Sequence, residues 1–268
     1  MPLSTPTLTT ERLRLRPFAA ADAEPLFALQ SDAYVLRYWD SPPWTERARA
    51  EQFIARSHAM AEEGSGARLV IERDSTFAGW CTLNSWNPDF RSASLGYCLA
   101  RAGWGQGIAT EAAGALLDWA FDTLDLNRVQ AEADTRNAAS ARVLEKLGFM
   151  LEGTLREDCV VNGDVSDSWV FGLLRREWFA RQRGTARNMS QQPLPAEGPD
   201  DPEYTEETGE DQEGGQVSAA ENLEGEGGTP IAPSDATAGY PDSESGSPDT
   251  HGSGPGEAPP ENRRDNDV

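Results

Sequence analysis

The feature that most restricts how this chain can fold is an abrupt change in composition near residue 185. Of the 45 acidic and 23 basic residues, 20 acidic and 3 basic ones lie at 185–268, which gives that segment -17 of the total net charge of -22. The segment is rich in Pro, Gly and Ser and contains only five Leu, Ile, Val or Phe residues. It can bury too little apolar area to offset the loss of chain entropy on folding. We therefore expect residues 185–268 to be a disordered acidic tail.

The first 184 residues are enough for one domain with a substantial core, but hardly for two. Their net charge is only -5, which argues against a basic face that would grip a nucleic-acid backbone. No run approaches the roughly 20 apolar residues of a membrane span, and the first residues lack the apolar core of a signal peptide. We expect a cytoplasmic protein that binds neither nucleic acid nor membrane, and no motif indicates its oligomeric state.

Cysteine and histidine are too scarce to suggest metal or disulfide chemistry. The three cysteines, Cys81, Cys98 and Cys159, are widely spaced and odd in number, which disfavours both a disulfide framework and a zinc site. We expect them to be buried thiols. Only His58 and His251 are present, and His251 lies in the tail. The sequence therefore predicts no metal and no histidine-based catalytic triad.

Apolar periodicity predicts strands and helices in an order typical of the α/β (α+β) class. Asp22 is a candidate cap for the first helix, and Gly148 is a natural cap at the end of the last one. The strands are expected at 12–16, 68–72, 77–83, 93–99, 128–134, around 160 and at 169–174, and the helices at 22–29, 45–57, after 107 and at 138–147.

A glycine-bearing loop connects one of these strands to the central helix. Residues 95–110 read LGYCLARAGWGQGIAT, which predicts a strand, a loop and a helix whose first turn lacks charged side chains. Free N–H groups at a helix start attract anions, and glycines allow a pyrophosphate to come close. Gly105 and Gly107 are the candidates for this role. By pattern alone, a plain strand-to-helix turn explains the segment equally well.

Two motifs in a fixed order give this loop a context. WGQGIATEA at 104–112 and NAASARVLEKLGF at 137–149 are separated by a helix and a strand. This arrangement resembles the acyl-CoA site of the GNAT N-acyltransferases. TERLRLRP near the start, LEGTLRE at 151–157 and VFGLLRREW at 170–178 resemble the RimJ/RimL branch, so that the likeness covers about residues 8–180. It implies a GNAT fold with a mixed central sheet flanked by helices, and it implies acetyl-CoA as the cosubstrate.

The resemblance also implies which residues hold the coenzyme. The strand at 93–99 is expected to part from the strand at 128–134, so that the pantetheine arm pairs with main chain near Leu99. Ala102 stands where the family usually has Gln or Arg, and backbone donors should therefore matter more than that side chain. The expected coenzyme-binding residues are Leu99, Trp104, Gly105, Gln106, Gly107, Ile108, Ala109, Thr110, Asn137 and Lys146.

Several of these residues have a structural alternative. Asn137 suits a helix N-cap as well as a bond to a pantetheine amide. Lys146, with Arg142 four residues before it, suits a solvated helix face as well as the 3′-phosphate of the coenzyme. Ser140 lies one helical turn after Asn137. In RimL-like enzymes this serine is the proposed acid for the leaving thiolate, and the alternative is a structural hydroxyl.

The general base is less determined, because Glu72, Glu132 and Asp134 all lie on strand patterns; Glu132 is our candidate. An α-amine has a reference pKa near 8 and needs little help, whereas a lysine amine near 10.4 needs a tuned base. We expect acetyl transfer to a primary amine, either a protein N-terminal α-amine of the ribosomal-protein type or a small-molecule amine. The alternative is a sensor or scaffold domain that binds acetyl-CoA without turnover.

Overall fold

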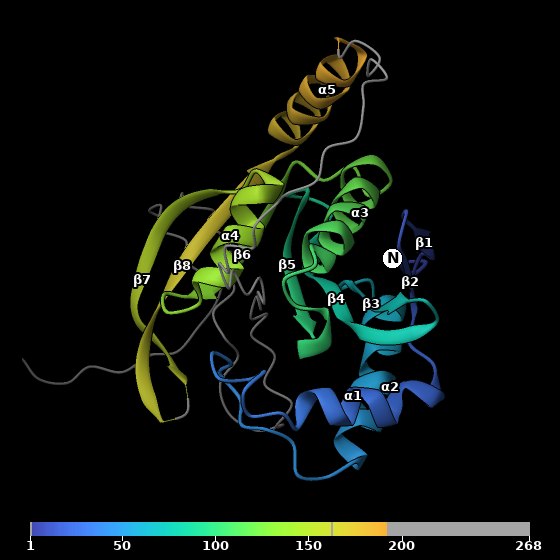
Figure 1. Cartoon of the computed structure of the whole chain (residues 1–268), viewed down its shortest axis with the longest axis vertical. Coiled ribbons are helices and arrows are strands. Elements are labelled where there is room, and N and C mark those ends of the chain that lie inside the picture. The colour runs from blue at the N-terminus through green and yellow to red at the C-terminus, as the bar shows by residue number, and fades with distance from the viewer. Residues whose placement is uncertain (1, 162, 192–268) are drawn as a thin grey trace, which may run out of the picture. The chain divides into compact units, whose positions relative to one another are not determined.

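A computed structural model describes residues 2–161 and 163–191 of the chain. Its centre is a mixed sheet of eight strands in the order β1-β2-β3-β4-β5-β6-β8-β7 (Figure 1). Neighbouring strands are antiparallel except β5 and β6, which are parallel. The strands are β1 (Leu8–Thr9), β2 (Leu13–Pro17), β3 (Ala67–Arg73), β4 (Thr76–Asn87), β5 (Ser92–Leu99), β6 (Arg128–Asp134), β7 (Met150–Val161) and β8 (Asp164–Leu174).

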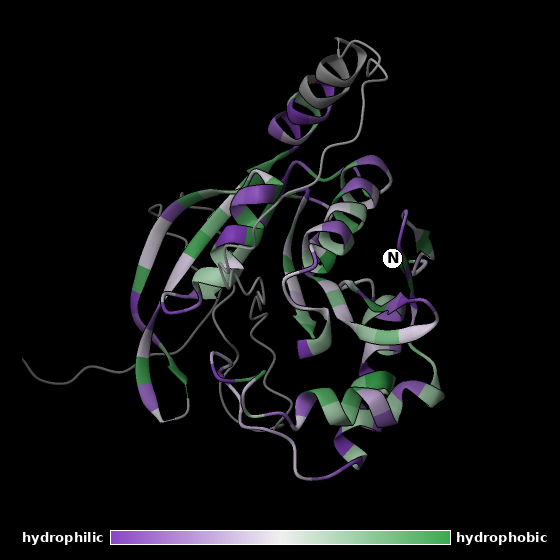
Figure 2. Cartoon of the chain, viewed as in Figure 1, coloured by the Kyte–Doolittle hydropathy of each residue, from purple (hydrophilic) through white to green (hydrophobic). Residues whose placement is uncertain are grey.

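Helices cover both faces of this sheet. Because successive residues of a strand point to opposite faces, neighbouring residues pack against different helices. Ile71 packs in the core beneath α3 and α4, whereas its neighbour Val70 packs in a second core with α1 and α2. Figure 2 shows the apolar residues concentrated on the strands and on α3. The helices are α1 (Ala23–Gln30), α2 (Ala48–Glu63), α3 (Ile108–Asp122), α4 (Ala138–Leu147) and α5 (Arg175–Gln191), with short 3-10 helices η1 (Ala20–Asp22) and η2 (Arg101–Gly103).

The parallel strands β5 and β6 stay together over only a short stretch. Their pairing runs from Ser92 opposite Arg128 to Ser94 opposite Gln130 and then stops. Both strands continue beyond this point, β5 to Leu99 and β6 to Asp134. The expected separation of these two strands is therefore confirmed, and main-chain groups on their facing edges are left without a strand partner there.

The element predictions were most accurate around this separation. The strand at 128–134 and the helix at 138–147 have the predicted bounds. Gly148 ends α4 in the left-handed region with φ 92°, as expected of a helix C-cap. The mixed sheet and its flanking helices confirm the predicted fold class.

Asp22 does not cap the first helix as expected. Its side chain makes no capping hydrogen bond to α1. The buried carboxylate instead accepts hydrogen bonds from Nη1 and Nη2 of Arg16, both at 2.8 Å, and from the backbone N–H of Ala19 at 2.7 Å. Both carboxylate oxygens are engaged by the bidentate bond from Arg16, so Asp22 ties the start of α1 to β2 rather than capping the first turn of the helix.

The helix α5 was not expected from the sequence. It begins directly after β8, and Trp178 in its first part packs into the core beneath α3. The helix extends to Gln191 and so includes residues 185–191, which composition assigns to the disordered tail. Once a helix has formed, adding residues to it costs little free energy per residue. The rest of the predicted tail, 192–268, lies outside the described residues. None of the described helices is long and apolar enough to span a bilayer.

Candidate functional site

The predicted glycine loop forms a helix start with free backbone donors. Gly105 and Gly107 both have φ 71°, a left-handed conformation that favours glycine. Gly107 is the N-cap of α3, and the N–H of Glu111 donates to the Gly107 carbonyl oxygen at 3.0 Å. The N–H groups of 108–110 precede this bond and have no acceptor within the helix. These donors and the helix dipole favour an anion at this position.

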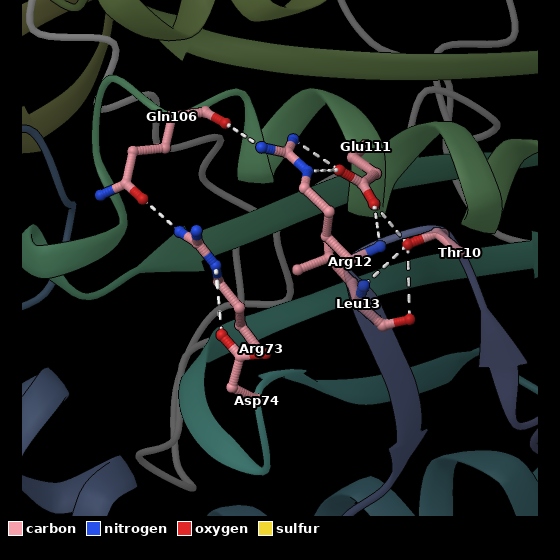
Figure 3. A network of polar contacts seen from close by, with 7 residues as sticks. All are labelled: Thr10, Arg12, Leu13, Arg73, Asp74, Gln106 and Glu111. Atoms are coloured by element: carbon pink, nitrogen blue, oxygen red, sulfur yellow. Dashed lines mark hydrogen bonds and ion pairs between the residues drawn. The ribbon is translucent and has the colours of Figure 1, made fainter.

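Two arginines from outside the loop hold it in shape. Arg12 Nη1 donates to the backbone oxygen of Gln106 at 3.0 Å, and the guanidinium of Arg73 donates to the side-chain oxygen of the same residue. Figure 3 shows both arginines reaching Gln106. The Gln106 amide also donates to the Ala102 oxygen at 2.7 Å. The Gln106 side chain therefore braces the loop, and the two arginines fix its conformation; both are themselves ion-paired, Arg12 with Glu111 and Arg73 with Asp74.

The first turn of α3 is charged, contrary to expectation, because Glu111 lies in it. Burial works to raise the pKa of Glu111, but hydrogen bonds from Thr10 and Arg12 outweigh it and hold the pKa below its usual value. Arg12 Nε donates to the carboxylate at 2.7 Å (Figure 3). Glu111 is thus ionised but neutralised by Arg12, and it does not oppose an anion at the loop.

Thr110, a predicted coenzyme residue, has a hydroxyl without a partner. Its Oγ1 is buried and forms no hydrogen bond within the described part of the chain. Buried hydroxyls normally form a hydrogen bond, so a hydroxyl without a partner at the start of α3 is consistent with a bond to a ligand there. The residue also lines a groove of about 800 Å³ beside β1 and α3, together with Asp118 and Trp178.

The end of β5 presents main-chain groups to the gap between the strands. The N–H of Ala100 donates to the Ala78 oxygen of β4 at 2.9 Å. Because neighbouring residues of a strand alternate their bonding edges, the N–H and C=O of Leu99 point the other way, toward β6. The Leu99 oxygen accepts a hydrogen bond from Trp104 Nε1 at 3.0 Å. The Leu99 N–H therefore faces the gap, and its bond to a pantetheine arm or an oxyanion stays a prediction.

Asn137 and Ser140 lie together at the start of α4. Asn137 is 2% exposed, and its side-chain oxygen accepts from the Ser140 N–H at 3.1 Å, so its role as N-cap is confirmed. Ser140 is fully buried, and its hydroxyl lies 3.1 Å from the hydroxyl of Tyr97 on β5. Tyr97 was not singled out from the sequence, because its alternation with Leu95 and Leu99 is that of an ordinary core residue.

An acidic cavity of about 110 Å³ lies beside the second strand of the gap. Ala131 of β6 packs in the core beneath α3 and α4, so Gln130 and Glu132 point to the opposite face. The segment after α1 and the strands β7 and β8 contribute the rest of the cavity wall. The cavity is lined by Tyr38, Asp40, Glu132, Ala133, Asp134, Asp158, Cys159, Val161 and Ser168.

Two carboxylates of this cavity differ in acidity. Burial raises the pKa of Glu132, and the charge of Asp158 adds to the effect, against a hydrogen bond from Gln130. Burial would also raise the pKa of Asp134, but bonds from Arg136 and Ser166 overcome it and hold that pKa below its usual value. When the pKa values of two neighbouring carboxylates move in opposite directions, the one with the raised pKa can accept a proton and the other stays ionised. Glu132 is the group suited to accept a proton.

The other candidate base lies outside this cavity. Glu72 of β3 forms ion pairs with Arg16 at 2.7 Å and with Arg14 at 3.4 Å. It does not line the acidic cavity. Glu72 is engaged by these two arginines and lies away from the cavity, so Glu132 stays our candidate base.

The other candidate residues are two cations on α4 and the three cysteines. Lys146 and Arg142 are both exposed, one turn apart on α4, and their contact with the 3′-phosphate stays a prediction. Cys81 and Cys98 are buried free thiols as expected, whereas Cys159 is only half-buried and lines the acidic cavity. Within 2–161 and 163–191, no group of three or more His, Cys, Asp or Glu residues could hold a metal ion.

Comparisons with known proteins agree with this geometry. Residues 12–150 match the family model described as "Acetyltransferase (GNAT) domain". The chain is 34% identical over 174 residues to the uncharacterized N-acetyltransferase p20 of Bacillus licheniformis, covering 64% of this chain and 98% of the relative. It is 27% identical over 180 residues to spermidine N(1)-acetyltransferase of Escherichia coli K12, covering 66% and 94%. The structure of Mycobacterium smegmatis RimJ in complex with CoA-disulfide matches with a TM-score of 0.62 at 26% identity, covering 68% of this chain and 95% of RimJ.

Proposed function

This chain belongs to the GNAT family of acetyltransferases, and on that premise we propose that it transfers the acetyl group of acetyl-CoA to a primary amine bound in the acidic cavity. The observation that carries the proposal is the separation of β5 from β6. The pairing ends at Ser94 and Gln130, and Glu132 lies just beyond this point. In this proposal, the gap between the strands connects the glycine loop, beside α3, to the acidic cavity on the opposite face.

The loop suits the diphosphate of the coenzyme. Gly105 and Gly107 let the backbone come close, and the N–H groups of 108–110 supply donors without requiring a side chain. Arg12 and Arg73 brace the loop through Gln106. With the diphosphate held there, an extended pantetheine arm would follow the free edge of β5 toward Leu99.

The acceptor side suits an amine that arrives as an ammonium ion. The carboxylates of Asp40, Glu132, Asp134 and Asp158 line the acidic cavity and attract a cation. Glu132 accepts the proton, and the freed nitrogen lone pair attacks the thioester carbonyl carbon. The carbonyl electrons move to oxygen, where the Leu99 N–H stabilises the negative charge.

The intermediate then breaks its carbon–sulfur bond as its nitrogen releases the proton that the amide product does not keep, and this proton offsets the one that the sulfur takes up. The electron pair leaves with sulfur as a thiolate, whose reference pKa near 8.5 makes it a tolerable leaving group at neutral pH. The Ser140 hydroxyl, in contact with Tyr97, is the candidate donor to that sulfur. Because Ser140 is fully buried, its alternative is a structural hydroxyl that links α4 to β5, and comparison of Ser140→Ala with wild type would separate the two roles.

We propose two acceptor classes, a protein N-terminal α-amine and a small-molecule amine. A relative is named as a spermidine acetyltransferase, and a structural neighbour is RimJ. A cavity with several carboxylates favours an acceptor that carries more than one positive charge.

A thiol-release assay tests the proposal with purified full-length protein, acetyl-CoA and three acceptor panels. The panels are N-terminal peptides, ribosomal proteins and small amines such as spermidine. We expect stoichiometric release of CoA and an acetylated product, identified by mass spectrometry, on one panel. Coenzyme binding without release on any acceptor would instead favour the sensor or scaffold alternative.

A further inference from the structure

One arginine is stacked among aromatic rings from both sides of the proposed site. The guanidinium of Arg37 lies 4.2 Å from the ring centroid of Tyr34, 4.7 Å from that of Tyr38 and 5.2 Å from that of Trp104. Tyr34 and Trp104 are also in ring contact, with centroids 5.8 Å apart. Arg37 Nη1 donates to the Tyr34 backbone oxygen at 2.6 Å. Arg37 thus joins its own segment, 31–40, to the loop that precedes Gly105.

A second contact reinforces this junction. Arg101, at the start of the same loop, forms an ion pair with Asp32 at 3.1 Å, and its guanidinium lies 5.4 Å from the Tyr34 ring centroid. The segment between α1 and α2 has no regular helix or strand over 31–40. Side-chain contacts therefore hold it in place rather than a backbone ladder. Buried Val35, Leu36 and Trp39 anchor it in the core with α1 and α2, and the Arg37 and Arg101 contacts tie it to the loop.

The two ends of this junction reach the two halves of the proposed site. On one side, the Trp104 indole donates to the Leu99 oxygen at the end of β5, where the coenzyme arm is proposed to lie. On the other side, Tyr38 and Asp40 of the segment line the acidic cavity. A continuous set of contacts runs from Leu99 through Trp104 and Arg37 to the cavity wall.

We propose that Arg37 is a positioning residue. When bound coenzyme fixes the conformation of the glycine loop, Arg37 fixes segment 31–40 in turn, and the acidic cavity is then held in the conformation that binds the amine. The inference rests on the proposed function, because it takes the acidic cavity as the amine site. Coenzyme that fixes the loop around Trp104 fixes the rings on which Arg37 stacks, and the segment then holds Tyr38 and Asp40 in place. By thermodynamic linkage, coenzyme and amine each increase the affinity for the other.

Hydrogen exchange on the full chain tests this coupling without any acceptor. CoA is added to wild type, to Arg37→Met and to Arg49→Met. The last variant is a matched control, because Arg49 also stacks on a tryptophan, Trp44 at 5.8 Å, but in a different place. In wild type and in the control, CoA should slow exchange over both 101–110 and 33–40. In Arg37→Met it should slow exchange over 101–110 only.

Kinetics give the second readout, with the amine found by the thiol-release assay. Arg37→Met should raise KM for the amine about tenfold, since cation–π contacts at exposed sites each change an equilibrium by a few-fold, while kcat and the Kd of CoA measured without amine change less than twofold. Arg37→Lys, which keeps the cation, should recover part of this loss, and Arg49→Met should match wild type.

The outcomes separate this inference from the proposed function. Loop protection by CoA without protection of 33–40 in wild type, or equal protection of 33–40 in Arg37→Met, would overturn the role of Arg37 and leave the acetyltransferase proposal intact. An equal fall of kcat in Arg37→Met and Arg49→Met would also overturn it, since that indicates general damage. Failure of CoA to protect 101–110 in wild type would contradict the coenzyme site itself.

Discussion

The proposed coenzyme loop and the acidic cavity are built in opposite ways. The loop is one continuous stretch, from Leu99 to Thr110, and it offers backbone N–H groups whose positions follow from two left-handed glycines. The cavity is assembled from the segment after α1 and from β6, β7 and β8, and it offers carboxylates. A site made of contiguous backbone can be recognised from sequence, whereas a site made of distant side chains requires the fold. The two sites should also respond differently to substitution.

The largest effect should follow from a change of backbone conformation in the loop. Gly107→Val places a β-branched residue at φ 71°, a conformation that costs L-residues energy. We expect CoA affinity to fall about 100-fold, since the free N–H groups of 108–110 lose their alignment. Isothermal titration with CoA measures the change.

The matched control for this variant is Gly153→Val. Gly153 is exposed on β7, and a Cβ there meets nothing within 4 Å. This variant should bind CoA as wild type does. Normal CoA affinity in a folded Gly107→Val protein would show that the loop does not hold the coenzyme.

In the acidic cavity, the expected effect is on turnover rather than on coenzyme binding. Glu132→Gln should lower kcat about 30-fold, less than the roughly 100-fold or more of typical general-base catalysis because an amine needs only partial help, and leave CoA affinity unchanged. A base works only when it is deprotonated, so wild-type activity should fall as pH drops through the pKa of Glu132, which burial raises above its usual value. The variant should lack this acid limb.

The control for the base is Glu72→Gln, which removes a carboxylate that lies on β3 and outside the cavity. Its pH-rate profile should keep the wild-type limb. An unchanged profile in Glu132→Gln would remove Glu132 from the mechanism and would indicate an acceptor amine that needs no base.

Asp134, in the same cavity, should affect stability instead. Its carboxylate accepts from Arg136 Nη2 and Ser166 Oγ, both at 2.7 Å, and its side chain is 2% exposed. Asp134→Asn should lower the free energy of unfolding by about 2 kcal/mol at pH 7, because charge-assisted bonds are lost. Urea denaturation measures it, with exposed Asp89→Asn as the control.

The pH dependence of this effect has a fixed sign. The pKa of Asp134 is lowered in the folded protein, so its contribution is present above the unfolded value near 3.9 and is lost as pH falls through the folded pKa. The difference between wild type and Asp134→Asn should therefore shrink in acid. A difference that stays constant down to low pH would assign the effect to packing rather than charge.

The smallest effect concerns Asn137, which caps α4. Asn137→Ala should cost about 1 kcal/mol of stability, the usual value of an N-cap, and Asn137→Asp should restore it because a carboxylate also accepts from the Ser140 N–H. Thermal unfolding and CoA titration are measured together. A loss of CoA affinity in the otherwise stable Asn137→Asp protein would support a bond from the Asn137 amide to pantetheine, and unchanged affinity would leave only the cap.

Features that depend on neighbouring residues are predictable from the sequence, and features that depend on contacts between distant segments are not. The strand at 128–134, the helix at 138–147 and the cap at Gly148 were read from local periodicity. Asp22 was misassigned as a cap because its real partner, Arg16 of β2, competes through a bidentate bond. Glu111 was overlooked in the first turn of α3, and its neutralisation by Arg12 is a contact between residues distant in sequence.

By itself, the sequence determined most of the elements, the fold class and the position of the glycine loop, because alternating apolar residues and left-handed glycines express their preferences within a few residues. Only the tertiary structure decided that Glu132 is the carboxylate with the raised pKa, that Tyr97 meets Ser140, and that Arg37 stacks on Trp104. Each of these depends on burial or on contact between segments far apart in the chain. Such proximity is produced by packing the two faces of the sheet and has no local signal in the residues themselves.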